Sequence, residues 1–441
     1  MVSKKTTASK KKTDARKPTR KPSTTKKKTA VKAKTISGRH ITVRMYNVGF
    51  GDAFLVLIPD GNRLRRILFD CGSIEAAAAT PMSSIVARIV QDVTDADGIP
   101  RIDVVVATHR HKDHVSGFGL PAWDKVEVSE VWMPWTEHPT DEVARQIRDV
   151  QSRLALGLDE SLKAQSAALN ATEQKKLRRY QDVVENALML SNDKAMKTLH
   201  SGFGGSPQRR FLPEKSGNTR TLETTALPNV KIHVLGPSRQ REVIRDMNPP
   251  KGESFLRLRD VADRQTSPLP APFAAEFREE KYTGAGATEE DLQEIQRAGS
   301  LSDLAVAVAL DKAVNGTSLM LLLEVSGTFL LFPGDAQWGT WNAVMEDPEW
   351  KELLGRIAFY KIGHHGSHNA TPKEFVEKMI PDGIHAMAST LPRQIWPDIP
   401  KQELLTGLNE KNAKIARSDQ PANVGKAFQV VRGVIETHIA L

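Results

Sequence analysis

Histidine and aspartate are concentrated in one short stretch, THRHKDHVSG at residues 108–117. It holds three of the chain's twelve histidines and an aspartate in the spacing H-x-H-x-D-H, and imidazole and carboxylate groups are ligands for divalent metals. In an extended segment residues two apart point to the same side, so His109 and His111 form one ligand pair. Asp113 and His114 follow after a turn and form a second. Two such pairs predict a site for two metals about 3.5 to 4 Å apart.

A site for two metals needs more than four ligands, and two later segments supply candidates. LLFPGDAQ places Asp335 after an apolar run and a glycine, where its two carboxylate oxygens can bridge a pair of metals. FYKIGHHGSHNAT places His364 and His365 after another apolar run. Each segment alone is weak evidence, because an aspartate after a glycine usually belongs to a turn and an adjacent histidine pair is as often structural. Found together in this order, they strengthen one another.

These ligands must be positioned by strand ends. Residues 101–109, RIDVVVATH, form a continuous apolar run typical of a strand buried on both faces, and the histidine cluster follows it directly. Layered α/β folds place their chemistry on the loops that leave such strands. Further strands are predicted at residues 41–59, 65–73, 229–238, 318–332 and 426–441.

The middle of the chain has a different periodicity. Apolar residues recur every three or four positions in residues 141–154 and 171–190, which predicts two amphipathic helices. We expect these helices to belong to a helical insertion at about residues 139–228. Residues 239–300 are polar and rich in proline, and we expect a second, irregular insertion there.

The net charge of +9 is distributed unevenly along the chain. Residues 1–38 contain 14 lysines or arginines and one acid, a balance of +13, which leaves −4 for residues 39–441. The first segment has almost no apolar residues, so we expect a disordered tail followed by one ordered domain. The tail either tethers the protein to nucleic acid by neutralising phosphates or serves only as a solubilising leader.

Composition also excludes several classes of protein. No apolar run approaches the roughly 20 residues that span a bilayer, and no apolar segment typical of a secretory signal is visible, so we expect no membrane partner. Cys71 is the one cysteine, which excludes an intramolecular disulfide and a cysteine-rich metal site. A cytoplasmic location fits these features.

The motifs together resemble the metallo-β-lactamase superfamily, and within it the hydrolase domain of ComEC-type competence proteins, without their membrane channel. The opening NVGFGDAFLVLIPDG…ILFDCG is similar to that family's D-V-G-Q-G-D-A segment followed by a strand and D-G-G. NGTSLMLLLEVSGTFLLFPGDA is similar to its N-x-S-L-V-L segment leading into T-G-D-A, and KIGHHGSHNAT to its K-x-x-H-H-G-S. The resemblance covers residues 39–138, 229–238 and 315–440, just over half of the chain.

This resemblance implies a four-layer αββα sandwich that holds two divalent metals, zinc or manganese. One metal would lie on the first histidine pair, and the second on the Asp113–His114 pair and His365, with Asp335 as the bridge. The implied metal ligands are His109, His111, Asp113, His114, Asp335 and His365.

The resemblance also implies other roles near the metals. Asp113 and His364 are the expected catalytic residues, although His364 is alternatively a metal ligand in place of His365. Asp70 either supports the ligand loop or only ends a strand. We expect Lys361, before the histidine pair, to be a charge at a strand edge.

The chain departs from the family in several places. Asn47 and Phe50 stand where the first motif usually has aspartate and glutamine. Glyoxalase-like relatives carry a further metal histidine in G-H-x-x-G-H, whereas this chain reads HVLGPS, and we expect His233 there to be a strand residue. The first metal therefore has fewer ligands. The family's G-H-P near the end is replaced by IWPDIP, so a substrate contact there is lost or changed.

These features predict a dinuclear hydrolase that uses a metal-bound hydroxide, with phosphodiesterase or nuclease activity favoured because related proteins act on nucleic acids and the tail suits a polyanion. Another ester, a lactone or a thioester is an alternative substrate, since the same kind of site serves them. A non-catalytic regulatory protein bound to nucleic acid is a further alternative. Trp132 and Trp135 either stack on bases or pack the helical insertion onto the fold.

Removal of residues 1–36 tests the role of the basic tail. Each neutralised phosphate contributes roughly 0.9 to the slope of log affinity against log salt on duplex DNA, so the shortened chain should bind nucleic acid more weakly and with a flatter salt dependence. Fluorescence anisotropy at several salt concentrations measures both quantities. Turnover of a small chromogenic phosphodiester should not change. Unchanged affinity and slope would mean that the tail is only a solubilising leader.

Overall fold

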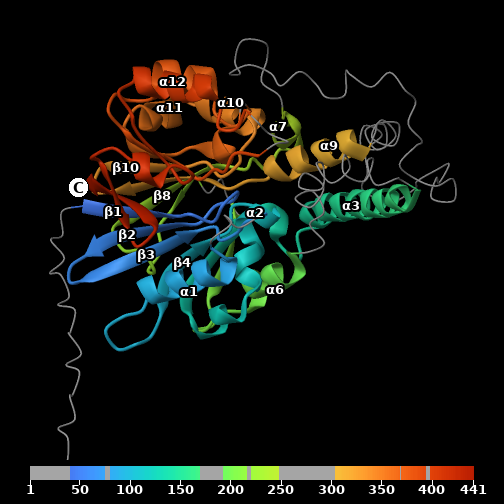
Figure 1. Ribbon diagram of the computed structural model, residues 1–441, viewed down its shortest axis with the longest axis horizontal. Coiled ribbons are helices and arrows are strands. Elements are labelled where there is room, and N and C mark those ends of the chain that lie inside the picture. The colour runs from blue at the N-terminus through green and yellow to red at the C-terminus, as the bar shows by residue number, and fades with distance from the viewer. Residues whose placement is uncertain are drawn as a thin grey trace, which may run out of the picture. The chain divides into compact units, whose positions relative to one another are not determined.

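A computed structural model describes residues 40–74, 80–168, 192–215, 220–247, 303–367, 369–393 and 398–441, with backbone alone in 161–168 and 303–308. In these residues the strands form two mixed β-sheets with helices packed against them, an α/β fold (Figure 1). No helix in the described ranges is both long enough and apolar enough to cross a membrane.

The first sheet has eight strands in the order β14-β15-β1-β2-β3-β4-β5-β6. β1 pairs antiparallel with β15 and β2, whereas β3, β4, β5 and β6 run parallel. The strands are β1 (His40–Tyr46), β2 (Phe54–Asp60), β3 (Arg63–Phe69), β4 (Arg101–Val106), β5 (Glu127–Pro134), β6 (Gln208–Leu212), β14 (Phe428–Val431) and β15 (Val434–Ala440).

The second sheet has seven strands in the order β13-β12-β11-β10-β9-β8-β7. β9 and β10 form a hairpin whose two turn residues, Ser326 and Gly327, both have positive φ, as a tight hairpin turn requires. β10 to β13 run parallel. The strands are β7 (Thr221–Leu222), β8 (Val230–Gly236), β9 (Met320–Val325), β10 (Thr328–Phe332), β11 (Ile357–Lys361), β12 (His385–Ala388) and β13 (Lys414–Arg417).

The two sheets pack face to face on one apolar core. Phe69 of β3 stacks on Phe332 of β10 with ring centroids 4.0 Å apart. β4 confirms the expectation of a strand buried on both faces, since Val104 and Val106 enter the core between the sheets and Val105 enters the core on the opposite face.

Helices cover the outer face of each sheet (Figure 1). α1 (Met82–Asp92) and α6 (Asp193–Ser201) pack on the first sheet through residues such as Ile85 and Leu199. α10 (Trp338–Glu346), α11 (Pro348–Leu354) and α12 (Gln402–Glu410) pack on the second sheet through residues such as Trp341 and Leu404. Each outer core is therefore built from an amphipathic helix face and one face of a sheet.

The remaining helical segments are mostly short. The α-helices are α2 (Lys112–Val115), α3 (Glu142–Ala168), α7 (Arg241–Arg245) and α9 (Asp303–Asn315). Single turns of other helix types lie at Ser116–Gly119, Pro121–Lys125, Trp135–Glu137, Gly363–Gly366, Phe375–Met379 and Pro421–Asn423.

The structure confirms part of the predicted helical middle. The amphipathic segment at residues 141–154 lies in α3, and α3 contacts α9, whereas residues 171–190 lie outside the described residues. The range predicted as a helical insertion also contributes β6 and β7 to the edges of the two sheets. Of the range predicted as an irregular insertion, residues 248–300 lie outside the described part. The closing strands predicted near residue 430 are β14 and β15.

Trp132 and Trp135 pack the fold and do not offer stacking faces. Both are buried, with 0% and 1% of their surface exposed. Trp132 lies in the core between the sheets and its Nε1 donates to Glu130. Trp135 contacts Ala144 of α3, and Arg239 covers its ring. The prediction that a tryptophan packs the helical insertion onto the fold is therefore confirmed for Trp135, whereas Trp132 packs between the two sheets.

An ion pair joins the histidine loop to the segment that leads into α3. Arg110, inside the H-x-H motif, donates two hydrogen bonds to Glu137, at 2.9 and 2.7 Å. Asn192 donates to the carbonyl of Arg110, which fixes the loop from the other side. Burial alone would raise the pKa of Glu137, but Arg110 and His200 lower it from its ordinary 4.5 to about 2.

Glu137→Gln tests this ion pair through the pH dependence of stability. Because the folded pKa is depressed, the pair stabilises the fold above pH 4.5 and loses its effect as the pH falls towards 2. The variant should lose about 3 kcal/mol of unfolding free energy at pH 7, and its curve should approach that of the parent as the pH falls to about 2. Urea unfolding at several pH values measures this. Glu127→Gln, in a more exposed ion pair with Arg101, is the control, and equal losses in the two variants would contradict the assignment.

Candidate metal centre

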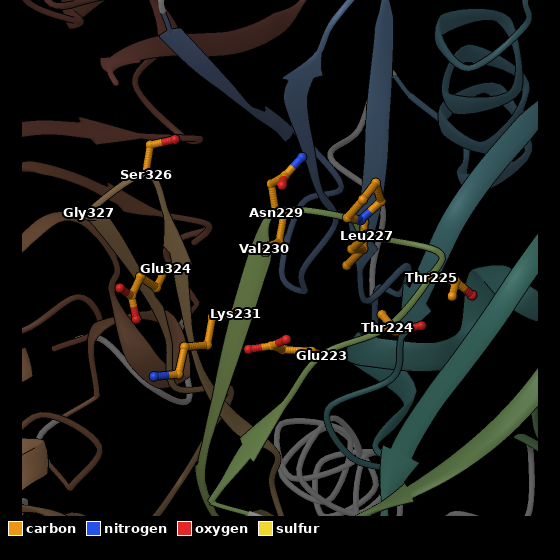
Figure 2. A pocket seen from close by; sticks show the side chains of 11 residues that line it. Glu223, Thr224, Thr225, Leu227, Asn229, Val230, Lys231, Glu324, Ser326 and Gly327 are labelled. Carbon is orange, nitrogen blue, oxygen red and sulfur yellow. The ribbon is translucent and has the colours of Figure 1, made fainter.

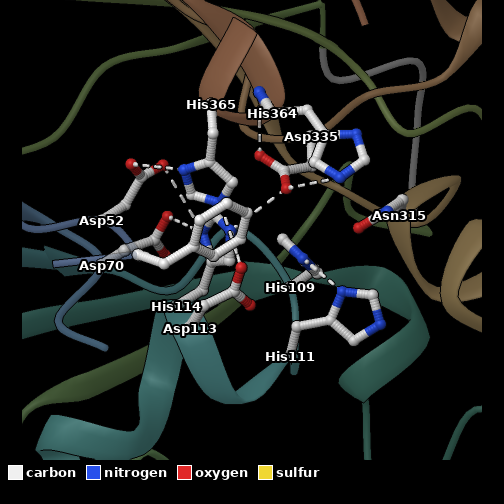
Figure 3. A network of polar contacts seen from close by, with 12 residues as sticks. Asp52, Asp70, His109, His111, Asp113, His114, Asn315, Asp335, His364 and His365 are labelled. Atoms are coloured by element: carbon white, nitrogen blue, oxygen red, sulfur yellow. Dashed lines mark hydrogen bonds and ion pairs between the residues drawn. The ribbon is translucent and has the colours of Figure 1, made fainter. Parts of the chain in front are cut away.

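The predicted ligands meet where strands of both sheets end. β4 leads into Thr108 and the histidine loop, β10 leads into Asp335, and β11 leads into His364 and His365. Residues from the two sheets, more than 200 positions apart in the sequence, therefore face one another (Figure 3). The structure brings together all seven residues that the sequence predicted for the site.

The first group consists of His109, His111 and Asp113, all buried. His109 Nε2 and His111 Nδ1 are 3.0 Å apart, a separation that suits two ligand atoms on one cation. α2 begins directly after His111, whose carbonyl accepts from the backbone N–H of His114 at 3.0 Å. This turn ends the extended segment and directs Asp113 and His114 towards the second group, as the spacing predicted.

The second group consists of Asp113, His114, Asp335 and His365, again all buried. His365 Nε2 lies 3.0 Å from an Asp113 carboxylate oxygen, and His114 Nε2 lies 3.2 Å from an Asp335 oxygen. Asp113 belongs to both groups. The two groups lie side by side and share one carboxylate, so each could hold a cation.

Three of these imidazoles are held from behind by a second polar group. Histidines that bind metals usually place one ring nitrogen on the metal and hydrogen-bond the other, which fixes the tautomer and the ring orientation. Three imidazoles of this cluster have such an outer hydrogen bond, so the residues fit divalent metals with nitrogen and oxygen ligands. The outer contacts are His109 Nδ1 with Thr108 Oγ1 at 3.1 Å, His114 Nδ1 with Asp70 Oδ2 at 2.8 Å, and His365 Nδ1 with the Ser389 carbonyl at 2.8 Å.

The two adjacent histidines occupy different positions. His365 is fully buried and belongs to the second group, whereas His364 is 16% exposed at its side chain and reaches Asp335 only at 3.8 Å. Both have left-handed backbone conformations, with φ of 45° and 55°. Such a conformation costs about 1–3 kcal/mol per residue and persists only where the surroundings impose it. This backbone turns the two imidazoles of neighbouring residues towards the same cluster.

Asp70 supports the ligand loop. Its carboxylate accepts hydrogen bonds from the N–H and the hydroxyl of Thr108, both at 2.7 Å, and contacts His114. Asp70 also has a left-handed φ of 55°, which carries β3 away from the sheet at this point. Of the two roles weighed for Asp70, its contacts favour support of the loop.

A buried ion pair between Asp52 and Lys361 stands beside the cluster. Asp52 is 1% exposed, and the Lys361 ammonium contacts it and lies 3.6 Å from Asp335. Lys361 is only 3% exposed, so its predicted place at a strand edge was wrong. Asp52, Asp70 and His114 form a third close group of possible ligands, in which Lys361 pairs with Asp52 and Thr108 donates to Asp70. The sequence analysis did not single out Asp52, although its place in the GFGDA motif was the available signal.

Two glycines allow this packing. The backbone of the histidine turn forms hydrogen bonds with the backbone of the GFGDA and DCG segments. In one of them, the N–H of Asp52 donates to the Asp113 carbonyl at 2.9 Å. A Cβ on Gly51 would lie 2.6 Å from the Asp113 carbonyl oxygen, and one on Gly72 would lie 2.5 Å from the His114 backbone. Any larger residue would push the ligand turn out of place.

The protonation states of the cluster suit cation binding in the carboxylates and in His111. Burial alone would raise the pKa values of Asp113 and Asp335, but His114 holds both below their ordinary range. Burial lowers the pKa of His111 to about 4. The carboxylates are therefore ionised and His111 is neutral at pH 7, which are the protonation states that metal ligands need. Against the effect of burial, the carboxylates around His114 and His365 instead raise the pKa of both imidazoles, so a metal bound there would have to displace a proton from each.

His233 and a separate surface hollow lie outside this centre. His233 Nε2 contacts Glu324 at 2.8 Å on the second sheet, which confirms that it is a strand residue.

A hollow of about 650 Å³, lined by residues that include Glu223, Lys231 and Ser326, lies at the hairpin turn before β10 (Figure 2). Asp335 follows the other end of β10, so the hollow is distant from the ligand cluster.

No protein-family model matches the chain, and no curated protein matches its sequence. The inferences about function therefore depend on the residues and their geometry.

Lys361→Met tests the buried ion pair. Removal of one member of a buried pair leaves an uncompensated charge, so the unfolding free energy should fall by about 3–5 kcal/mol, and Asp52→Asn in the same chain should restore part of the loss. Chemical unfolding in the presence of a chelator measures the effect without bound metal. Lys373→Met, in the exposed pair with Glu377, should change stability by less than about 1 kcal/mol. A Lys361→Met variant as stable as this control would show that the buried pair contributes little.

Proposed function

We propose that this chain is a dinuclear metal-dependent hydrolase of the metallo-β-lactamase type, and that its substrate is a phosphodiester, most simply a nucleic acid. The observation that carries the proposal is the pair of ligand groups that share Asp113 and draw donors from both sheets. Bound zinc or manganese would lower the pKa of a coordinated water and polarise a phosphoryl oxygen.

The arrangement of layers supports the proposed αββα sandwich. One core joins the two sheets, and each outer face carries its own helical layer. The loops that leave β4, β10 and β11 then supply the ligands, as the resemblance implies. The buried free thiol of Cys71 is consistent with a reducing interior such as the cytoplasm.

The predicted ligands and two supporting residues have roles in this proposal. His109 and His111 would hold the first metal, and Asp113, His114 and His365 would hold the second. The resemblance makes Asp335 the bridge, whereas the geometry puts Asp113, and not Asp335, in both ligand groups. Asp70 and Ser389 would fix the orientation of the rings that they contact.

His364 has the position expected of a residue that contacts the substrate. It is the most exposed imidazole of the cluster, and burial still lowers its pKa below the ordinary value. Its ring is therefore neutral at pH 7 and would donate an N–H hydrogen bond to a phosphoryl oxygen. Because it borders Asp335, a substrate bound there would lie beside the metal pair.

A substrate panel distinguishes the possible activities. Single- and double-stranded DNA, RNA, a simple chromogenic phosphodiester, and ester, lactone and thioester compounds would be incubated with zinc or with manganese. Cleavage of phosphodiesters alone supports the proposal, and turnover of another ester assigns that chemistry instead. Two bound metals with no turnover of any substrate would favour the non-catalytic interpretation.

Asp113→Ala and Asp335→Asn test the shared and bridging carboxylates. Asp113 lies in both ligand groups, so its loss should abolish hydrolysis and reduce the metal content below two equivalents. Asp335→Asn should also lower the metal content, because an amide cannot bridge two cations as a charged carboxylate does. Elemental analysis after dialysis measures the metal, and circular dichroism checks the fold. An Asp113→Ala protein that retains two metals and normal turnover would refute the assignment.

A further inference from the structure

The outer nitrogen of His111 differs from those of the other three imidazoles in the two ligand groups. The other three rings have a hydrogen-bond partner on the side away from the cluster. His111 Nε2 is buried and has no such bond in the described residues. It faces Asp311 of α9, whose carboxylate oxygen lies 3.8 Å away. α9 therefore approaches the first ligand group from the side opposite to the histidine loop.

Asn315 lies one helical turn further along α9 and is also directed at this group. Its side chain is fully buried, and its Nδ2 donates to Asp311 at 3.2 Å. This hydrogen bond fixes which end of the amide faces the histidines, and Figure 3 shows the Oδ1 atom on that side. Oδ1 has no hydrogen-bond partner in the described structure. A buried carbonyl oxygen without a partner costs about 1–3 kcal/mol, so it requires an explanation.

The first ligand group has three residues and the second has four, so the first has room for one more protein ligand, which this oxygen can supply. His109 and His111 are its two imidazoles, and Asp113 is shared with the second group. β8 ends at Gly236 without a histidine, and His233 is turned to Glu324. α9 brings a buried donor oxygen, Asn315 Oδ1, to this side.

We propose that Asn315 Oδ1 is the third protein ligand of the metal held by His109 and His111. Asp311 supports it in two ways, because it accepts from the Asn315 amide and, after a small approach, from His111 Nε2. The spacing i, i+4 places both residues on one face of the helix. This inference rests on the proposed metal centre and specifies the composition of its first position.

An amide oxygen changes the character of that position. It is neutral and harder than an imidazole, so it binds zinc less strongly and favours manganese or magnesium more than a third histidine would. The first metal should consequently exchange more readily than the second. Occupation of the first position would also hold α9 against the histidine loop.

Asn315→Leu tests the proposal by metal binding alone. The variant keeps an apolar side chain of similar size without the oxygen. Elemental analysis after dialysis and titration calorimetry with zinc and with manganese would measure stoichiometry and affinity. One of the two metals should bind at least about tenfold more weakly, and the other should bind as in the parent. Unchanged affinities for both metals would overturn the inference.

The chain offers a matched control in Asn342. Its Nδ2 donates to Glu346 at 3.0 Å, the same i, i+4 amide–carboxylate contact on α10. Asn342→Leu should leave both metals bound as in the parent. If it weakened one metal as much as Asn315→Leu does, the effect would come from general loss of helix stability, and the proposed ligand would be wrong.

A second variant covers the case in which Asn315→Leu does not fold. Asn315→Asp keeps an oxygen at the same place and adds a charge beside Asp311. It should bind both metals at least as tightly as the parent, and metal should raise its melting temperature by more, because the cation relieves repulsion between the two carboxylates. Weaker binding of one metal by this variant would overturn the inference. A parent protein that binds no metal would refute the proposed function itself, whereas two metals bound equally by parent and variants would refute only the role of Asn315.

Discussion

The structure depends on the burial of four carboxylates where the two sheets meet. Asp52, Asp70, Asp113 and Asp335 are each no more than 2% exposed. A buried charge without a partner costs several kcal/mol, so each must be paired. Lys361 forms an ion pair with Asp52, and the hydroxyl of Thr108 donates a hydrogen bond to Asp70. Asp113 and Asp335 face the imidazoles of His365 and His114, and these are the carboxylates that the proposed metals would share with the histidines.

The same constraint limits which residue types fit around the centre. Gly51 and Gly72 allow the GFGDA and DCG segments to lie directly against the histidine turn. Left-handed backbone conformations, which cost conformational energy, direct the side chains of Asp70, His364 and His365 to the place where the two sheets meet. The fold supplies that energy through three apolar cores, which hold both sheets and their outer helices in register.

Local sequence patterns predicted the parts of the centre that depend on short spacing. The apolar run before His109, the H-x-H-x-D-H turn and the strands before Asp335 and His364 are all properties of adjacent residues, and the α/β class follows from them. Contacts between distant segments were less accessible. From the sequence, Lys361 is predicted to be a surface charge, and only its contact with Asp52 in the structure shows that it is buried. The sequence around Asn315 predicts no role for it, and only the packing of α9 beside His111 reveals one. β6 and β7 are short, so their pattern was overlooked within a range dominated by helical periodicity.

The pairing of β1 with β15 connects the folding of this domain to the order in which it is made. His40 lies opposite Ala440, so the strand that begins the described fold takes its neighbour from the last strand in the sequence. Until β15 has left the ribosome, β1 has an open edge on that side, and contacts between such distant segments form slowly. The first sheet therefore stays incomplete until β15 has been made. During that interval an unpaired strand edge is available to other chains, so this protein should depend on chaperones more than a domain built from local contacts.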